Sequence, residues 1–143
     1  MTSPSSTLML HLKNAGYNST KPRELVFKSL QENAPLSMHE LYTSLQNDVD
    51  RTSVYRTVAL FEKLHIAQRV AKGWKYRIEL TDEFVPHHHH FTCTQCHASL
   101  SFDEPALLDN MLETVARQNG FVVSAHTLEI EGLCSACLSK TSN

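Results

Sequence analysis

Two Cys-x-x-Cys motifs constrain most strongly how this chain can fold. They are Cys93-Thr94-Gln95-Cys96 and Cys134-Ser135-Ala136-Cys137, and 37 residues separate them. Structural zinc sites are commonly tetrahedral sets of thiolates supplied by two such pairs. The separation is longer than in most zinc fingers, but pairs at the ends of folded elements tolerate any loop length. We therefore expect the fold to bring both pairs together around a structural zinc, with a redox dithiol as the weaker alternative.

A run of four histidines, His87 to His90, directly precedes the first motif. In an extended chain, successive side chains point to opposite faces, so the run should supply two separate sites. On one face we expect a tetrahedral set of His87, His89, Asp109 and His126. On the other face we expect Glu79, His88 and His90. Taken alone, His126 and Asp109 would also suit an ordinary strand histidine and a solvated helix carboxylate.

Charge divides the 143-residue chain into two parts. Residues 1–80 hold 11 Lys and Arg against 7 Asp and Glu, whereas the remainder holds 2 against 8. We expect a DNA-binding domain at 1–81 and a metal-binding dimerisation domain at 82–143. No apolar run approaches the roughly 20 residues that span a bilayer, and the start lacks the features of a secretory signal. We therefore expect a cytoplasmic protein with no membrane association.

The order of predicted elements indicates an α+β fold. In the first part, helices are expected at 23–32, 37–46 and 50–65, followed by strands at 66–70 and 74–81, which is the order of a winged helix. In the second part, strands are expected at 91–93, 100–102 and 121–131, with a helix at 105–118, which suits a small α/β dimerisation domain.

A polar face at the start of the third predicted helix and the basic hairpin after it favour DNA binding. The residues that we expect to contact DNA are Arg51, Thr52, Tyr55, Arg56 and Lys72. We also expect Arg69 and Lys75 of the hairpin to meet phosphates. Tyr55 as a half-buried surface aromatic and Arg56 as a solvated charge remain the plainer interpretation of each residue alone.

On these residues the chain resembles the ferric-uptake-regulator (Fur) superfamily of metal-responsive repressors. The resemblance covers nearly the whole length, and its most specific parts are Val54-Tyr55-Arg56 and the histidine run entering Cys93-Thr94-Gln95-Cys96. It implies an N-terminal winged helix and a C-terminal α/β dimerisation domain. It also implies a homodimer that binds double-stranded DNA at palindromic operators.

The resemblance further implies residue roles. Tyr55 and Arg56 match the family's DNA-contacting pair, and the four cysteines match its structural zinc set. The residues that match the metal site inside the dimerisation domain are His87, His89, Asp109 and His126. The residues that match the interdomain regulatory site are Glu79, His88 and His90.

The sequence departs from the family pattern at positions that affect which metal the protein would bind. His89 stands where iron-responsive members usually carry an aspartate, which makes the chain most similar to the zinc-uptake regulators. Many of those, however, have a cysteine at the position of Glu79. Pro35 and Ser101 stand where several members have a histidine and an acid. The candidates for a fourth ligand of the interdomain site are His65, Asp103 and Glu104.

We therefore predict a homodimeric, zinc-dependent repressor of metal-uptake genes. Zinc is expected as the regulatory metal because three imidazoles and one carboxylate favour it. An iron- or manganese-responsive repressor and a peroxide sensor of the same superfamily are the alternatives. A zinc hydrolase is a remote one, because the sequence has no His-Glu-x-x-His motif and no nucleophile elbow.

Overall fold

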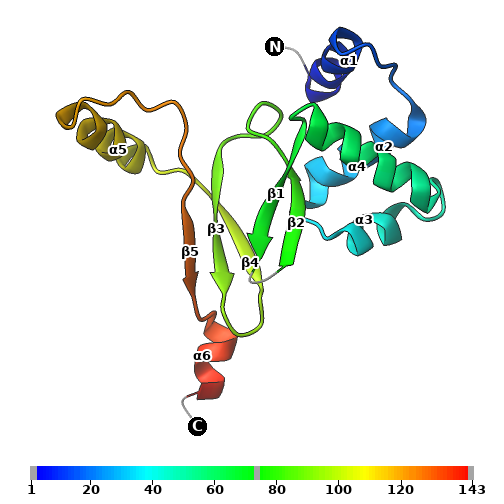
Figure 1. Cartoon of the computed structure of the whole chain (residues 1–143). Coiled ribbons are helices and arrows are strands. Elements are labelled where there is room, and N and C mark those ends of the chain that lie inside the picture. Colours follow the sequence, from blue (N-terminus) through cyan, green and yellow to red (C-terminus); the bar gives the residue numbers. More distant parts are fainter. Residues whose placement is uncertain (1–2, 73–74, 142–143) are drawn as a thin grey trace. The chain divides into compact units, whose positions relative to one another are not determined.

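The protein divides into two compact units, Met1–Val85 and Pro86–Asn143. The structure is a computed structural model that describes residues 3–72 and 75–141 (Figure 1). In the described residues a run of helices is followed by a run of strands and then by a shorter mixed segment, as expected for an α+β chain. No helix of the described residues is long and apolar enough to cross a membrane.

The first unit extends a few residues beyond the expected boundary at 81. The Thr81 hydroxyl donates a hydrogen bond to the carbonyl oxygen of His65 at 2.9 Å. Phe84 is buried, and its ring centroid lies 5.4 Å from that of Phe27. These contacts hold the segment after the hairpin against the first unit.

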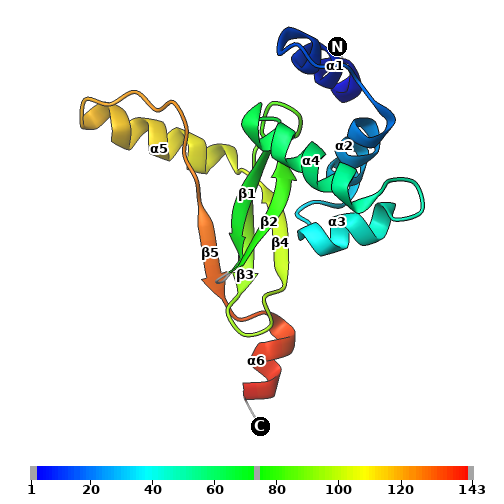
Figure 2. The ribbon, with the colours of Figure 1, turned by 45° about the vertical axis from the view of Figure 1, so that its right-hand side comes forward.

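In its described residues the first unit has four helices followed by two antiparallel strands (Figures 1 and 2). The three expected helices and the hairpin are present, and a further helix precedes them. Gly73 and Trp74, where the turn and the start of the second strand were expected, lie outside the described residues. The elements are α1 (Pro4–Asn14), α2 (Lys21–Asn33), α3 (Met38–Leu45), α4 (Arg51–Lys63), β1 (Ala67–Lys72) and β2 (Lys75–Leu80).

Helix α4 packs with one apolar face inward. Val54, Val58 and Phe61 are buried, each at 3 % exposure or less. Burying such a side chain stabilises the fold by roughly 1.5–3 kcal/mol. The face carrying Tyr55 and Arg56 therefore remains exposed, because the apolar stripe fixes the rotation of the helix about its own axis.

Side chains cap α3 and α4 at their first residues. Ser37 and Glu40 form the predicted capping box on α3, in which each side chain accepts a hydrogen bond from the other residue's backbone N–H. Asp50 caps α4 through both carboxylate oxygens, which accept from the Ser53 N–H and hydroxyl at 2.9 and 2.6 Å. These bonds from Ser53 lower the pKa of Asp50.

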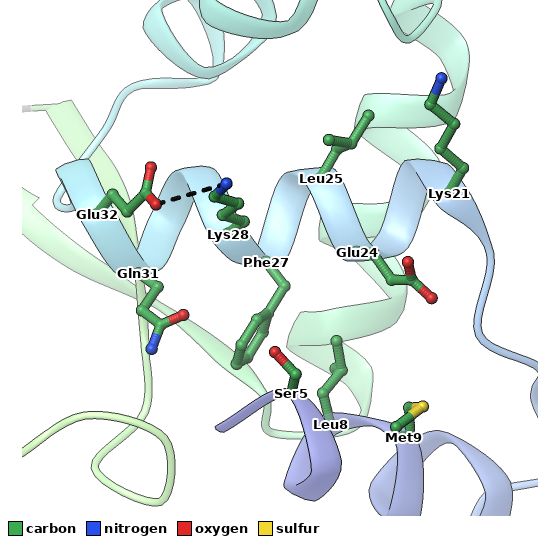
Figure 3. A pocket seen from close by; sticks show the side chains of 10 residues that line it. All are labelled: Ser5, Leu8, Met9, Lys21, Glu24, Leu25, Phe27, Lys28, Gln31 and Glu32. Carbon is green, nitrogen blue, oxygen red and sulfur yellow. Dashed lines mark ion pairs between the residues drawn. The ribbon is translucent and has the colours of Figure 1, made fainter. Parts of the chain in front are cut away.

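Helix α1 was not expected from the sequence. Ser3 caps it by accepting a hydrogen bond from the Ser6 N–H at 3.3 Å, and Pro4 occupies the first turn. Leu8 and Leu12, one turn apart, are its buried residues. A groove with Leu8 and Phe27 among its lining residues lies between α1 and α2, as Figure 3 shows.

The described residues of the second unit contain a three-stranded sheet in the order β4-β3-β5 and two helices. Strands β3 and β4 are antiparallel, whereas β3 and β5 are parallel. The elements are β3 (His88–Cys93), β4 (Ser99–Asp103), α5 (Ala106–Gln118), β5 (Glu129–Gly132) and α6 (Ser135–Thr141). The short helix α6 was not expected.

The expected strand over 121–131 is wrong for most of its length. Only Glu129–Gly132 forms a strand, because only these residues pair with β3. Phe121 and Val122, whose side chains favoured a strand, are 72 % and 94 % exposed. Strand propensity depends on a neighbouring strand, and these two residues have none in the described chain.

Candidate metal centres and nucleic-acid interface

The four cysteines converge, although 37 residues separate the two motifs. Their sulfur atoms all lie within 4.8 Å of one another. The parallel pairing of Cys93 with Gly132 brings the end of β3 beside the end of β5, and Cys134 and Cys137 follow immediately. All four thiols are free. This grouping is the one that the sequence predicted.

Hydrogen bonds already distinguish the thiols. The Cys134 N–H donates to the Cys93 sulfur at 3.4 Å and, as the largest contribution, lowers the pKa of Cys93 to about 5. Contact with the Cys134 side chain, followed by burial, raises the pKa of Cys137 to about 12. Packed thiolates repel one another, so full ionisation needs a cation among them. A tetrahedral thiolate set of this kind fits zinc.

A second cluster joins three imidazoles to one carboxylate. Glu104 Oε1 lies 2.8 Å from His126 Nε2 and 3.5 Å from His89 Nε2, and Glu104 Oε2 lies 3.4 Å from His87 Nε2. His89 is almost fully buried in β3, while His126 lies between α5 and β5. The cluster thus draws on three separated segments of the second unit.

The chemistry of this cluster fits a bound cation. In the described part of the chain, His89 Nε2, His126 Nε2 and Glu104 Oε1 are buried, and none of them makes a hydrogen bond despite their proximity. A buried polar atom without a hydrogen bond costs about 1–3 kcal/mol. Nitrogen and carboxylate atoms that converge within 4.8 Å of one another are suited to hold one metal ion, and His87 completes a set of four.

Asp109 is not part of this cluster, which differs from the expectation. It lies in the first turn of α5, whereas Glu104 directly follows β4. The antiparallel register pairs His88 with Asp103, so Glu104 lies one residue beyond that pair, next to His87. Glu104 had been a candidate for the other histidine site. Only the strand register identifies its actual neighbours.

His88 and His90 share the opposite face of β3, in agreement with the expected alternation. Their ring centroids lie 4.9 Å apart. His88 Nδ1 lies 2.9 Å from the Pro86 carbonyl oxygen, which it can reach as a donor, and His90 Nδ1 lies 3.4 Å from the Ser101 hydroxyl. Glu79 belongs to the first unit, so its grouping with these histidines stays a prediction.

The expected DNA-contacting residues of α4 are exposed on one helix. Arg51, Thr52, Tyr55 and Arg56 all have exposed side chains, with Tyr55 at 42 %. Lys72 is the last residue of β1 and pairs with Lys75 across the hairpin. The two elements that carry the proposed contacts therefore belong to the same unit.

Arg69 has a partner inside the protein, which the sequence did not indicate. Its guanidinium binds both carboxylate oxygens of Glu62 on α4. It also lies 4.2 Å from the centre of the Tyr76 ring on β2. Arg69 thus ties the hairpin to α4, and its charge is already compensated.

Comparison with known proteins gives consistent results. The family model described as the ferric uptake regulator family matches residues 14–131. The ferric uptake regulation protein of Bordetella parapertussis is 31 % identical over 132 residues, which cover 88 % of this chain and 93 % of the relative.

Two solved structures show the same fold. The Vibrio cholerae ferric uptake regulator is 27 % identical with a TM-score of 0.68, and the match covers 87 % of this chain and 98 % of the other. A zinc-bound manganese uptake regulator is 28 % identical with a TM-score of 0.64, and the match covers 90 % and 98 %. The first is named for ferric uptake and the second for manganese uptake.

Proposed function

Because the chain belongs to the ferric uptake regulator family, it is a metal-responsive transcription regulator, and we propose that it is a cytoplasmic, zinc-dependent repressor of metal-uptake genes. The observation that carries the choice of metal is the cluster of three imidazoles and one carboxylate. Nitrogen-rich sets of four ligands favour zinc, whereas iron and manganese favour more oxygen ligands and a higher coordination number.

Three metal sites are proposed. The structural site consists of Cys93, Cys96, Cys134 and Cys137. The site inside the second unit consists of His87, His89, Glu104 and His126. Glu79, His88 and His90 are proposed as the interdomain regulatory site. When bound, zinc would supply positive charge that holds segments distant in sequence together.

Regulation requires that metal binding favour one arrangement of the two units. Glu79 lies on β2 of the DNA-binding unit, and its carboxylate accepts a hydrogen bond from Gln68 at 3.0 Å. His88 and His90 lie on β3 of the other unit. A site shared by these residues would bind metal more tightly in the arrangement that fits DNA, and DNA would then raise the metal affinity by the same factor.

A homodimer is proposed because the described residues of the second unit form no hydrophobic core of their own. Among its described residues, those that are buried are His89, His90, Cys93 and Cys137, all of them metal-ligand types. Helix α5 buries none of its 13 residues. An isolated helix of that length is marginal in water, so α5 needs a surface to pack against. A second copy would supply one, and its symmetry would match a palindromic operator.

The experiment is a DNA-binding titration by fluorescence anisotropy across buffered series of zinc, iron(II) and manganese. We expect affinity to rise with free zinc and to fall with added salt, because lysine and arginine contacts release counterions from DNA. Tyr55→Ala and Arg56→Ala should lose binding while the circular dichroism spectrum stays unchanged. A DNA affinity that changes neither with added zinc nor with added chelator would refute the proposal.

Iron is the second candidate metal. The Bordetella parapertussis relative and the Vibrio cholerae structure are both named as ferric uptake regulators. The same titration decides between the metals, because an iron-responsive protein would bind DNA at free iron concentrations where buffered zinc has no effect.

A further inference from the structure

An arginine at the start of α4 lies close to two tyrosine rings. The guanidinium carbon of Arg51 lies 5.4 Å from the centre of the Tyr55 ring and 6.0 Å from that of Tyr42. Its Nη2 lies 3.5 Å from the Tyr55 hydroxyl oxygen, to which it donates. A guanidinium near aromatic rings is attracted by the negative ring faces, so both neighbours limit the rotamers of Arg51.

The two rings come from different helices. Tyr55 lies one turn after Arg51 on α4, whereas Tyr42 lies on α3. Tyr42 is half-buried and packs against the core of the first unit, so its ring has a fixed position. Arg51 is therefore oriented by the body of the domain as well as by its own helix.

The charge of Arg51 is not neutralised within the described part of the chain. Its contacts there are with the two tyrosines, and the neighbouring Asp50 carboxylate is engaged by Ser53. Arg69 of the β1–β2 hairpin differs in this respect. It also lies over a tyrosine ring, but its charge is paired with Glu62. Arg51 thus combines a restrained position with an available positive charge.

We infer that Arg51 is a preformed phosphate contact at the start of the DNA-reading helix and that Tyr42 is the positioning residue that holds it. The inference rests on the proposed DNA-binding function. Arginine binds phosphate oxygens through its planar set of N–H donors, and the N-terminus of a helix favours an anion. Restraining the side chain in advance lowers the entropy lost when DNA binds.

The test measures binding of the full-length, zinc-loaded protein to a labelled 30-base-pair duplex that the wild type has selected from a randomised library. Tyr42→Leu and Arg51→Lys keep the charge but remove the restraint. We expect each to weaken binding roughly two- to five-fold without changing the salt dependence. Arg51→Gln should weaken binding further and flatten the salt dependence, because a phosphate contact is lost.

Two comparisons separate positioning from a general structural effect. Tyr42→Leu made in the Arg51→Gln background should have no further effect, because the residue that it positions is gone. Tyr42→Phe keeps the ring and should bind like the wild type. Lys28→Gln removes one charge from α2 of the same unit and serves as the matched control, with affinity expected within two-fold of the wild type.

The outcomes distinguish the inference from the proposed function. Unchanged binding by Arg51→Lys, which leaves the core intact, would overturn the inference even if Tyr42→Leu failed to fold. The inference would also be overturned if Tyr42→Leu weakened DNA binding as much in the Arg51→Gln background as it does in the wild type. If the wild type selects no duplex with zinc or iron, the proposed function itself fails.

Discussion

A single carboxylate lies beside three imidazoles in the cluster of His87, His89, Glu104 and His126. Glu104 is held at the end of β4 and places its two oxygens 2.8–3.5 Å from His87, His89 and His126. Its side chain is 12 % exposed, so its charge has little access to water. A metal ion bound there would lose its only anionic protein ligand if this residue were neutralised.

We therefore predict that Glu104→Gln lowers the zinc affinity of the second site by at least roughly ten-fold, the size of effect that even outer-shell changes typically have. Competition with a chromophoric chelator measures this loss, and the four-cysteine site should keep its own zinc equivalent. Asp109→Asn, in the first turn of α5, is the matched control and should leave both equivalents unchanged. A loss of zinc in Asp109→Asn with none in Glu104→Gln would reverse the assignment.

At the level of residues, the sequence predicted those side-chain groupings that follow from chain spacing. The spacing of the two Cys-x-x-Cys pairs predicts a shared site. The alternation of the histidines predicts two faces, because successive side chains of a strand point in opposite directions. Glu104 and Asp109 are both acids near one helix start, and spacing does not separate them. The choice depends on the pairing of His88 with Asp103, which is a long-range property of the sheet.

Among the elements, α3 and β2 are tied together by an ion pair. Glu40 both completes the capping box of α3 and binds Arg77 of β2. Burial alone would raise the pKa of Glu40, but hydrogen bonds from Ser37 and the charge of Arg77 together lower it below 4.5. A carboxylate with a lowered pKa stabilises the folded state when it is ionised.

Glu40→Gln should therefore reduce stability at pH 7 by about 0.5–1 kcal/mol, a modest value because the carboxylate is 44 % exposed and screened by water. The stabilisation is present above the unfolded-state pKa of 4.5 and is lost as the pH falls through the lowered pKa of the folded state, so the difference from wild type should shrink as the pH falls below 4.5. Thermal melting followed by circular dichroism at pH 7 and pH 3.5 checks this.

Glu32→Gln provides the control for that measurement. Glu32 pairs with Lys28 at 3.9 Å on the exposed surface of α2, an interaction of a few tenths of a kcal/mol. Its effect at pH 7 should be smaller than that of Glu40→Gln. Equal effects of the two substitutions would show that the link between α3 and β2 contributes nothing specific.

The elements that the sequence predicted well are those with a strong local signal. The capping box of α3 and the apolar stripe of α4 are examples, because both are complete within one helix. Helix α1 offers only Ser3, Pro4 and two buried leucines, a weak periodic signal over 11 residues. The strand expected from Phe121 did not form for the opposite reason: its residues have strong strand propensity, but no strand of the described residues pairs with them.

At the scale of the whole molecule, the second unit exposes an apolar surface of the kind that packs against another protein surface. Leu107, Met111 and Val115 follow one another at four-residue spacing along α5 and are 80 %, 55 % and 52 % exposed. Residues four apart lie on one face of a helix, so they form a continuous stripe. Phe91 and Leu100, paired across β3 and β4, add exposed apolar area on the sheet.

If this stripe packs against a second copy, a charge at its centre should prevent association. We predict that Met111→Glu shifts the protein from dimer to monomer in sedimentation velocity at micromolar concentration, because the carboxylate would be buried without a partner. The DNA affinity should fall as well, because a monomer has one DNA-binding unit where the dimer has two. Met9→Glu makes the same substitution at a methionine that is 49 % exposed on α1, and it should leave the dimer intact. Dissociation by both variants, or by neither, would place the dimer contact away from α5.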